Sequence, residues 1–447
     1  MSETTSNVKD TASMNKRTPN RFTVIMAGGS GTRMKSVLPK PLITVGTKPM
    51  IVHLIDNVRS LGTEIVLIVS EKTKGVFVET LIKSNYVTHI KDDVYYRNGS
   101  IIHICVQPVS NGTGGALMAT TDFFKSKNPD DTVLVLSGDV PLITKRTMQT
   151  MFNKIESDAT SCVILAKDTD DNFGYGRVVT DTTPSGDRTF VKIVEQKDCN
   201  DEERKITFIN TGTYAFRVGP LLRSFSRLNS NNSQKEYYLT DCPRIIKEDS
   251  FEQTNPIKLH VIDGKSNIYD ETLGANTPEQ LEQLRLEYLK KFRVDNILES
   301  DSNMSDENIR NLMRVLDQLS SKRTTTKLED LDLNMIRHHV TASQNSTMNR
   351  KTTFIVKFEE TVVGTASVLI EDKLIHDMGR ASHIEDVVVD EEYRGLGLAK
   401  LLMLRLIEYS KEQRAYKIIL DASDDVKGFY EKLGFKQHSN SMRMNIE

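Results

Sequence analysis

A glycine-rich segment near the start of the chain, residues 27–31, constrains the fold more than any other part of the sequence. It follows an apolar run, residues 22–26, whose length and composition are typical of a short buried strand. Gly28, Gly29 and Gly31 carry no side chains, so the backbone can turn sharply and come close to a ligand. The successive amide groups of such a loop form a concave surface that suits an anion.

Two cationic side chains, Arg33 and Lys40, follow the glycines. One is a planar fork of hydrogen-bond donors and the other is a mobile point charge, a combination that suits a polyphosphate. A tight turn without any ligand is the alternative, because glycine is the usual turn residue. The spacing fits neither a Walker loop nor a dinucleotide-binding loop. The segment therefore predicts a polyphosphate site of another kind.

Composition and charge exclude several classes of protein. The 447 residues leave room for two or three domains. A formal net charge of -2 argues against a nucleic-acid partner, and no apolar run approaches the roughly 18–20 residues that cross a membrane. Residues 1–20 are polar and lack the core of a signal peptide, so we expect a disordered tail there. Four widely spaced cysteines favour free buried thiols and a cytoplasmic location.

Residues 21–290 alternate segments typical of strands and helices, which predicts a first domain of the α/β class. An amphipathic helix is expected over residues 50–61, with Thr47 as its cap and Pro49 in its first turn. The order of the segments predicts a mostly parallel, Rossmann-like sheet, whose ligands bind beyond the carboxyl ends of the strands. The predicted strands cover residues 22–26, 64–69, 101–106, 132–136, 162–166 and 258–262.

Asp139 follows another apolar run, residues 132–136, and lies at the same predicted edge of the sheet as the glycine-rich loop. A carboxylate close to a triphosphate is repelled unless a cation lies between them. Mg²⁺ takes hard oxygen ligands and keeps much of its water, so Asp139 is a candidate ligand for it. A capping or turn aspartate is the alternative, since Gly-Asp is common in turns.

Seven motifs in order resemble the nucleoside-diphosphate-sugar pyrophosphorylases, and among them the bacterial N-acetylglucosamine-1-phosphate uridylyltransferases. The resemblance implies a GT-A-like nucleotidyltransferase domain over residues 21–290 that transfers a uridylyl group from UTP to N-acetylglucosamine 1-phosphate. The motifs lie at residues 26–41, 111–116, 134–142, 174–177, 194–198, 209–212 and 236–241.

The same resemblance implies roles for individual residues. Arg33 and Lys40 would hold the triphosphate and act in catalysis, while Asp139 and Asn276 would bind Mg²⁺. The sugar would contact Gly176, Glu195 and Asn210. The nucleotide would contact Ala27, Gly28, Gly29, Gly31, Gln107, Gly112 and Thr113. Such a transfer depends on positioning and charge neutralisation, so it needs no nucleophile from the protein.

The remainder, residues 291–447, predicts a second domain. A helix is expected to begin after Ser305, a plausible cap, and polar loops are expected at residues 320–327 and 342–351. Two strands over residues 353–358 and 362–371 would then form a hairpin. No six-residue repeat is present after residue 290, so a β-helix is not expected.

A second glycine turn, in Arg394-Gly395-Leu396-Gly397-Leu398-Ala399, lies between a predicted strand and a predicted helix. Backbone amides at a helix N-terminus bind phosphate. The motif fits the GCN5-related N-acetyltransferases, whose loop binds the pyrophosphate of acetyl-CoA. Its context, residues 373–376, 383–386, 417–421 and 428–435, resembles the eukaryotic-type glucosamine-6-phosphate N-acetyltransferases.

That resemblance implies that Glu385 and Asp386 line the reacting centre, where the Asp386 amide would polarise the thioester carbonyl. Tyr430 would protonate the departing thiolate and Asp421 would orient the sugar amine, although Tyr430 as a packing aromatic is the alternative. Glu385 and Asp386 are expected on opposite faces of a strand. The predicted acetyl-CoA contacts are Val387, Val389, Arg394, Gly395, Gly397, Leu398, Ala399 and Tyr430.

The sequence thus predicts a fusion of two enzymes of UDP-N-acetylglucosamine biosynthesis, with Mg²⁺ as cofactor and UTP and acetyl-CoA as co-substrates. Its partners would be small molecules, not nucleic acid or membrane, and we expect a homodimer through the second domain. Three alternatives stay open. The first domain would use another hexose 1-phosphate, the second would acetylate a different amine such as a protein lysine, or the chain would be a nucleotide-sensing scaffold without catalysis.

Overall fold

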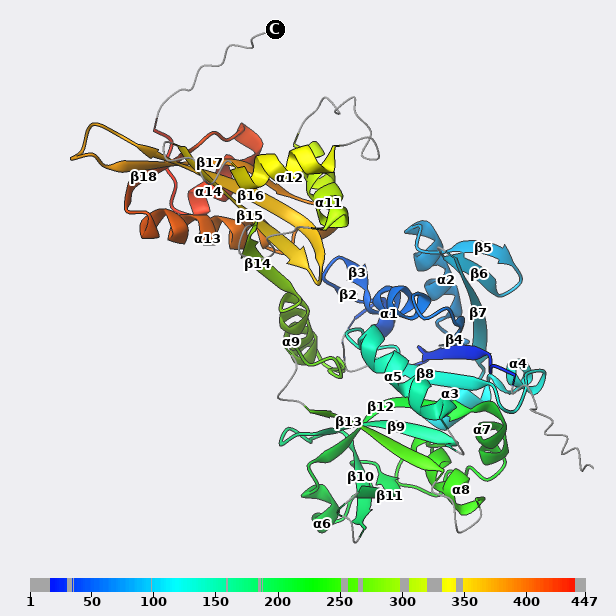
Figure 1. The fold of residues 1–447 in the computed structure, drawn as a ribbon. Helices are drawn as coiled ribbons and strands as arrows, with labels where there is room; N and C mark the ends of the chain where they lie inside the picture. Colours follow the sequence, from blue (N-terminus) through cyan, green and yellow to red (C-terminus); the bar gives the residue numbers. More distant parts are fainter. Residues whose placement is uncertain are drawn as a thin grey trace, which may run out of the picture. The chain divides into compact units, whose positions relative to one another are not determined.

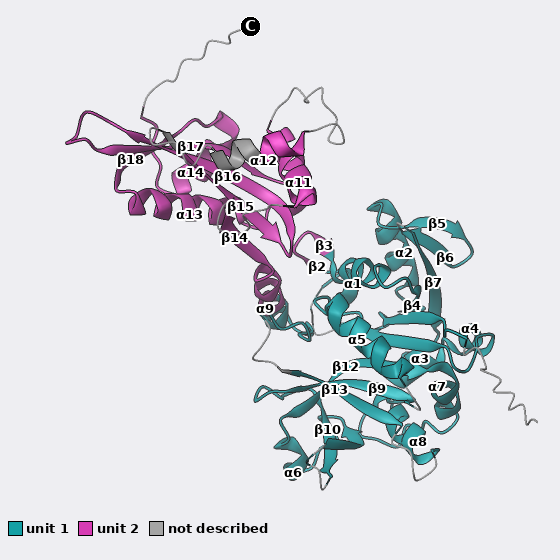
Figure 2. Cartoon of the chain, viewed as in Figure 1, with its two compact units in different colours: residues 1–43, 49–281 teal, residues 44–48, 282–447 magenta. Residues whose placement is uncertain are grey.

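The computed structural model describes residues 17–29, 34, 36–97, 99–157, 160–183, 186, 188–250, 256–263, 268–297, 305–319, 332–342 and 349–438. The chain divides into two compact units (Figure 2). Unit 1 comprises residues 1–43 and 49–281, and unit 2 comprises residues 44–48 and 282–447. The change of unit falls inside helix α9 (Pro278–Leu289), and the predicted domain ranges themselves stay predictions.

The centre of unit 1 is a parallel group of four strands in the order β8, β1, β4, β7 (Figure 1). These strands are β1 (Arg21–Met26), β4 (Glu64–Ser70), β7 (Ser100–Gln107) and β8 (Thr132–Ser137). Antiparallel strands extend the sheet past β7, namely β6 (Val94–Arg97) and β5 (Thr88–Lys91). On the other side lie β12 (Phe208–Arg217), β10 (Gly176–Thr182), β11 (Arg188–Val194), β9 (Cys162–Asp168) and β13 (Ile257–Asp263).

Alternation along the central strands builds two cores, one on each face of the sheet. Val24 of β1 joins one core and the next residue, Ile25, joins the other. Val135 and Leu136 of β8 divide in the same way. One face is covered by α1 (Met50–Arg59), α2 (Lys74–Lys83) and α5 (Lys145–Glu156). The other is covered by α3 (Thr113–Met118), α4 (Thr121–Lys125), α7 (Val218–Phe225) and α8 (Cys242–Glu248).

All six predicted strands of unit 1 are present, so the α/β class is confirmed. The expectation of a mostly parallel sheet holds for the central four strands and for the pair β9 and β13, but β12 pairs antiparallel with both β8 and β9, and the edge strands are also antiparallel. Thr47 does not cap α1; Pro49 holds the N-cap position with extended backbone angles. Thr47 instead lies between the short strands β2 (Thr44–Val45) and β3 (Lys48–Pro49). The four cysteines are free, as expected, but Cys105 is only half-buried.

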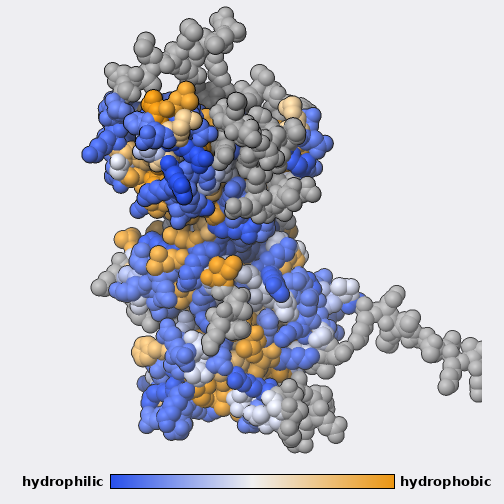
Figure 3. Space-filling model, turned by 60° about the vertical axis from the view of Figure 1, so that its left-hand side comes forward, coloured by the Kyte–Doolittle hydropathy of each residue, from blue (hydrophilic) through white to orange (hydrophobic). Residues whose placement is uncertain are grey.

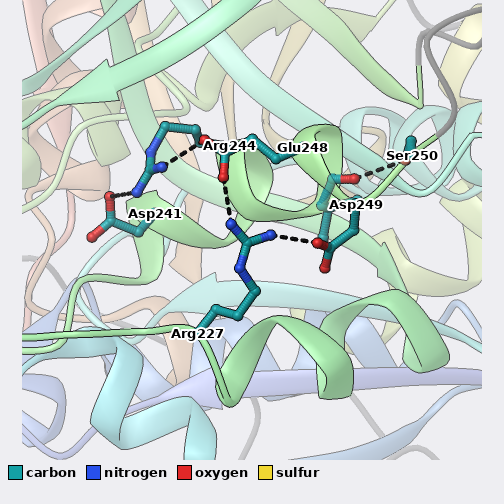
Figure 4. A network of polar contacts seen from close by, with 7 residues as sticks. Arg227, Asp241, Arg244, Glu248, Asp249 and Ser250 are labelled. Carbon is teal, nitrogen blue, oxygen red and sulfur yellow. Dashed lines mark hydrogen bonds and ion pairs between the residues drawn. The ribbon is translucent and has the colours of Figure 1, made fainter.

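The described part of unit 1 also contains the short helical segments η2 (Lys40–Leu42), η3 (Leu239–Asp241) and α6 (Asp201–Arg204). A polar network holds η3 and the adjoining α8 in place (Figure 4). Arg244 donates to Glu248 at 2.7 Å and to Asp241 at 3.4 Å. Arg227, beyond the end of α7, donates to the same Glu248 at 2.7 Å and also pairs with Asp249. These ion pairs connect the ends of α7 and α8 on the surface.

Unit 2 is a five-stranded sheet in the order β14, β15, β16, β17, β18. The first four strands are antiparallel and β18 runs parallel to β17. The strands are β14 (Phe292–Asn296), β15 (Asn349–Phe358), β16 (Thr361–Asp372), β17 (Arg380–Val389) and β18 (Ala415–Leu420). The helical elements are α11 (Asp306–Asp317), α12 (Leu333–Ala342), η5 (Glu391–Tyr393), α13 (Leu398–Glu412) and α14 (Asp424–Lys432).

The two faces of this sheet carry different helices (Figure 1). Ile355 packs with Ile309 and Leu312 of α11, whereas the adjacent Phe354 stacks edge-on with Tyr409 of α13 at 5.4 Å between ring centroids. The predicted cap at Ser305 is confirmed, since its hydroxyl accepts a hydrogen bond from the Asn308 amide. The predicted hairpin of β15 and β16 is also confirmed.

The predicted loop over residues 342–351 is wrong at both ends, because α12 reaches Ala342 and β15 begins at Asn349. The predicted loop over residues 320–327 lies outside the described residues. On the face drawn in Figure 3, hydrophilic residues cover most of the surface and hydrophobic residues form separate groups. None of the described helices has the length and apolarity required to cross a membrane.

We predict that Gly46→Ala destabilises unit 2 by about 2–4 kcal/mol, as the sum of a left-handed backbone cost and an overlap with a packed ring. Gly46 has φ +66°, and an added Cβ would fall inside contact distance of the Tyr288 ring. Gly434 also has positive φ, but nothing described lies within 4 Å of an added Cβ there. Gly434→Ala should therefore cost only about 1–2 kcal/mol. Calorimetric unfolding of both variants checks this, and equal losses would contradict the role of the ring.

Candidate active site

The predicted sugar and metal residues of unit 1 surround one cavity of about 200 Å³. It opens beyond the carboxyl ends of β1 and β8, where Met26 and Ser137 are part of its wall. The rest of the wall comes from β12, the starts of α3 and β10, the turn after β8, the segment after β11, η3 and the loop after β13. Of the residues named from the sequence, the cavity is lined by Thr113, Asp139, Gly176, Glu195, Asn210 and Asn276.

Lys40, Asp139 and Asn276 meet at one side of this cavity. The Lys40 ammonium donates to Asp139 Oδ2 at 2.5 Å and to Asn276 Oδ1 at 2.9 Å. The Lys40 side chain is 14% exposed and that of Asp139 is 11% exposed. On its other side the Asp139 carboxylate accepts a hydrogen bond from the Ser137 hydroxyl, Oγ to Oδ1, at 2.5 Å. Three distant parts of the chain therefore converge on one buried carboxylate.

The donor set at this point fits Mg²⁺. Asp139 and Asn276 present one carboxylate oxygen and one amide oxygen, both hard ligands, to a single cationic group. No cluster of three or more acidic, histidine or cysteine side chains suited to a metal occurs among the described residues. Mg²⁺ commonly uses only one or two protein oxygens, with water and substrate phosphates as its other ligands.

The charge of Lys40 controls the ionisation of Asp139. Burial acts to raise the pKa of this carboxyl, but the charge and hydrogen bond of Lys40, helped by the Ser137 hydroxyl, outweigh it. The pKa of Asp139 therefore lies below its usual range, and the carboxylate is ionised at neutral pH.

Glu195 and Asn210, the predicted sugar contacts, line the cavity, and each is held by a neighbour. Thr240 donates its hydroxyl to Glu195 Oε1 at 3.0 Å, and the Asn210 amide donates to the Tyr214 hydroxyl at 2.6 Å. Gly176 pairs with Asn210 across β10 and β12. Burial, followed by the nearby carboxylates, raises the pKa of Glu195 despite the hydrogen bond from Thr240. The cavity thus offers polar groups whose positions are fixed by their neighbours.

The strand that carries Gly176 is fixed by Arg177, which is 1% exposed. Its guanidinium donates to the Tyr175 carbonyl and, at 2.8 Å, to Gln196 Oε1. The same Gln196 oxygen accepts the Gly174 amide at 3.3 Å. The sequence shows Arg177 inside a motif but gives it no role, because the side-chain partner, Gln196, follows β11 and is 19 residues away along the chain.

The predicted nucleotide contacts also come together. Gln107, at the end of β7, donates its side-chain amide to the Gly112 carbonyl at 3.2 Å. A Cβ added to Gly28 would lie 2.9 Å from the Gln107 side-chain oxygen, so the glycine loop and Gln107 are neighbours. Ala27 is buried, and Gly29 is exposed. Gly31 and Arg33 lie outside the described residues.

In unit 2 the end of β17 is irregular where the reacting centre is predicted. Ser367 pairs with Glu385 and Thr365 with Val388, so Asp386 and Val387 together face Ala366 in a bulge. Asp386 has φ +56°, a left-handed conformation that is strained for this residue. The bulge interrupts the regular alternation at this point, and both Glu385 and Asp386 are exposed.

The loop after β17 leads through two left-handed glycines, Gly395 and Gly397, into α13. Gly397 is the N-cap of α13, so the first amide groups of this helix face the loop. The Arg394 guanidinium donates to the Val389 carbonyl at 3.0 Å and to Gln318 Oε1 at 3.1 Å. Val389 and Leu398 are buried, and Val387 and Ala399 are half-buried.

Tyr430 lies on α14 and stacks edge-on against Phe429, with 5.0 Å between the ring centroids. Burial raises its pKa, so the phenol keeps its proton at neutral pH. Asp421 is exposed, just after β18. The structure therefore places Tyr430 in a packed position and Asp421 at the surface.

Comparisons with known proteins match two different families to two parts of the chain. Residues 22–256, more than half of the chain, match the nucleotidyl transferase family model. The chain belongs to the nucleotidyl transferase family. Residues 319–435 match the acetyltransferase (GNAT) family, so this nucleotidyl transferase carries a second transferase domain.

The relatives of this nucleotidyl transferase include two bacterial proteins named bifunctional protein GlmU. The one from Clostridium botulinum (strain 657 / Type Ba4) is 37% identical over 269 residues, 60% of this chain and 52% of the relative. The one from Lactococcus lactis subsp. lactis (strain IL1403) is 35% identical over 273 residues, 61% of this chain and 53% of the relative. The chain thus spans about half the length of the curated relatives it matches.

A solved structure of glucosamine-6-phosphate N-acetyltransferase from Arabidopsis thaliana shares 28% sequence identity with 35% of this chain. That match covers 99% of the solved chain, and its TM-score is 0.29.

The sequence missed several residues that the nucleotidyl transferase places at its cavity. Thr240 lies within the motif at residues 236–241, and its hydroxyl next to Asp241 was the only sign in the sequence that it belongs to the site. Tyr214 and Thr272 had no signal, because each reaches the cavity through its place at a strand end or in the loop after β13. Ser137 also had no signal, because its contact with Asp139 depends on the turn after β8.

We predict that Gly29→Ala and Gly112→Ala separate ligand contact from folding. Gly29 has nothing described within 4 Å of an added Cβ, so Gly29→Ala should keep the melting temperature and weaken UTP binding at least about tenfold. Gly112 has φ +102°, and an added Cβ would lie 2.5 Å from the Tyr237 carbonyl oxygen. Gly112→Ala should therefore cost at least about 2 kcal/mol of stability. Thermal unfolding and calorimetric UTP titration check both; an unchanged UTP affinity in Gly29→Ala would remove the loop from the site.

We also predict that Glu195→Gln stabilises the protein at neutral pH. The folded state raises the pKa of Glu195, so the unfolded chain releases this proton first as the pH rises, and stability falls. A glutamine keeps an acceptor for Thr240 and removes this cost. The gain in melting temperature should be present at pH 7–8 and absent below about pH 4, where Glu195 is protonated in both states. A gain that does not depend on pH would contradict this origin.

Proposed function

We propose that the chain is a bifunctional enzyme that catalyses two steps in the biosynthesis of UDP-N-acetylglucosamine. Unit 1 would transfer the uridylyl group of UTP to N-acetylglucosamine 1-phosphate, and unit 2 would transfer the acetyl group of acetyl-CoA to glucosamine 6-phosphate. One observation carries the first assignment: a single cavity joins a cation-binding side, with Lys40, Asp139 and Asn276, to a polar side with Glu195 and Asn210. The name of the bacterial relatives supports it.

In unit 1 an oxygen of the sugar phosphate attacks the α-phosphorus of UTP, a new P–O bond forms, and pyrophosphate leaves. Asp139 and Asn276 would hold Mg²⁺, which neutralises charge on the phosphate oxygens when it is bound. Lys40, together with Arg33, would hold the triphosphate. The protein needs no base, because the attacking oxygen is already an anion, and its work is positioning and charge neutralisation.

Recognition of the sugar would depend on Glu195, Asn210 and the backbone of Gly176. The free carboxylate oxygen of Glu195 accepts hydrogen bonds, whereas the amide of Asn210 is able both to donate and to accept. Thr240 and Tyr214 fix these side chains before the sugar arrives. A site whose buried polar groups need partners rejects sugars that lack the matching hydroxyl or amide.

In unit 2 the neutral amine of the sugar attacks the thioester carbonyl, and the coenzyme thiolate leaves. The exposed left-handed bulge at Asp386 would aim its amide at the developing oxyanion. Tyr430, whose raised pKa keeps its proton in place, would protonate the thiolate. Glu385 would line the reacting centre and Asp421 would orient the amine. The amides after Gly395 and Gly397 would bind the coenzyme pyrophosphate. Because the product of unit 2 carries phosphate on a different carbon from the substrate of unit 1, a mutase must act between them.

We predict that Asp139→Ala abolishes one activity and keeps the other. Release of pyrophosphate from UTP should fall at least about 100-fold, since metal-ion stabilisation contributes several kcal/mol to the transition state. Acetyl transfer to glucosamine 6-phosphate should not change, because Asp139 belongs to unit 1. Both rates are measured on the same preparation. Tyr430→Phe is the reciprocal control, and retained uridylyl transfer in Asp139→Ala would remove the metal assignment.

A panel of substrates tests the sugar assignments. N-acetylglucosamine 1-phosphate should give the highest kcat/KM among hexose 1-phosphates, and glucosamine 6-phosphate should be acetylated in preference to lysine peptides. Another hexose as best substrate would favour the first alternative, and acetylation of peptides alone would favour the second. Absence of both reactions would favour a nucleotide-sensing scaffold. The homodimer through unit 2 and the cytoplasmic location stay predictions.

A further inference from the structure

The contact of Lys40 with Asp139 and Asn276 differs from the role expected from the sequence. Lys40 was expected to face a triphosphate, yet its ammonium bonds the two oxygens that are the predicted magnesium ligands. One positive charge therefore lies between the same two atoms that a divalent ion would use. An ion bound to both oxygens would come within a few Å of the ammonium, and the two cations would repel each other.

The surroundings keep Asp139 directed towards this point. Ser137 donates its hydroxyl to Oδ1 of Asp139, which leaves Oδ2 for the ammonium of Lys40. Neither side chain of the ion pair is more than 14% exposed, so water offers little replacement for the contact. A buried carboxylate that loses its cation is strongly disfavoured, so Lys40 leaves Asp139 only when another cation arrives.

The backbone of Lys40 is fixed, whereas its side chain has freedom to move. Lys40 begins the short helix η2 and lies between Pro39 and Pro41, both of which are buried. Proline fixes its own φ and restricts the residue before it. The four-carbon side chain of Lys40 carries three donors on rotatable bonds, so it exchanges partners without a change of fold. A polyphosphate next to the glycine loop would offer the ammonium a new anionic partner.

We propose that Lys40 is a tethered cation that excludes Mg²⁺ from Asp139 and Asn276 until a polyphosphate draws its ammonium away. The ion and the nucleotide would then enter together, and the bare ion would bind poorly. This inference rests on the proposed metal site of unit 1 and adds an order of binding to it. It also gives Lys40 two successive partners, the carboxylate in the free protein and the triphosphate in the complex.

Binding of Mn²⁺, followed by electron paramagnetic resonance of the free ion, tests the proposal without any turnover. Without nucleotide, Lys40→Met should bind Mn²⁺ at least tenfold more tightly than the wild-type chain, because the competing cation is gone. Lys167→Met is the matched control, since Lys167 is also 14% exposed and pairs with another carboxylate, Asp270, at 2.6 Å. It should bind Mn²⁺ as the wild type does. Inorganic tripolyphosphate should tighten Mn²⁺ binding in the wild type more than in Lys40→Met.

The outcomes separate this inference from the proposed function. Equal or weaker Mn²⁺ binding by Lys40→Met than by the wild type would overturn the exclusion by Lys40. If, in the presence of tripolyphosphate, Asp139→Ala binds Mn²⁺ as tightly as the wild type does, the metal assignment of the proposed function fails instead. Lys40→Gln, whose side-chain amide is still able to donate to Asp139, replaces Lys40→Met if that variant does not fold. If neither variant binds Mn²⁺ more tightly than the wild type, the proposal is contradicted.

Discussion

The buried contact of Lys40 with Asp139 joins the fold of unit 1 to its chemistry. Asp139 follows the central strand β8, Lys40 follows the glycine-rich loop, and Asn276 precedes α9, so three distant segments share one charge pair. In a dry environment neither charge is stable alone. The contact therefore connects the segments at this side of the cavity. It also fixes the positions of Asp139 Oδ2 and Asn276 Oδ1, the two oxygens that would bind a metal ion. A site of this kind is preorganised because its charged groups already have partners before any substrate binds.

The predicted sugar contact Glu195 differs from the pair of Lys40 and Asp139, because it lowers stability in the free protein. Glu195 is half-buried, the neutral Thr240 donates a hydrogen bond to it, and desolvation raises its pKa. Such a group costs stability at neutral pH, which is the expected condition of a carboxylate kept available for a ligand. The neighbours Thr240 and Tyr214 fix orientation, and Arg177 fixes the strand behind them. Rigid neighbours reduce the entropy that a ligand must remove when it binds.

The proposed anion site of unit 2 also depends on glycines before a helix. Gly395 and Gly397 adopt left-handed angles before α13, and Gly397 caps this helix, so the first amides of α13 face the loop. The strain at Asp386 is different, because an aspartate occupies the left-handed conformation in the middle of a strand. The ladder on both sides of the bulge holds it there, and the bulge exposes two consecutive acidic side chains that a regular strand would separate.

Sequence periodicity was sufficient for features that depend on local patterns. The six strands of unit 1, the cap at Ser305 and the glycine turn before α13 all follow from such patterns. It failed where pairing between distant segments decides the result. The antiparallel pairing of β12, the bulge at Asp386 and the staple made by Arg177 each depend on a neighbouring strand that one segment does not specify. The partner of Lys40 is another feature that depends on distant segments. A lysine predicts that an anion is bound, but only the convergence of strand ends decides which anion is near. Residue type therefore indicates the chemistry of a site, and the pairing of distant segments determines which charged groups are in contact in the free protein.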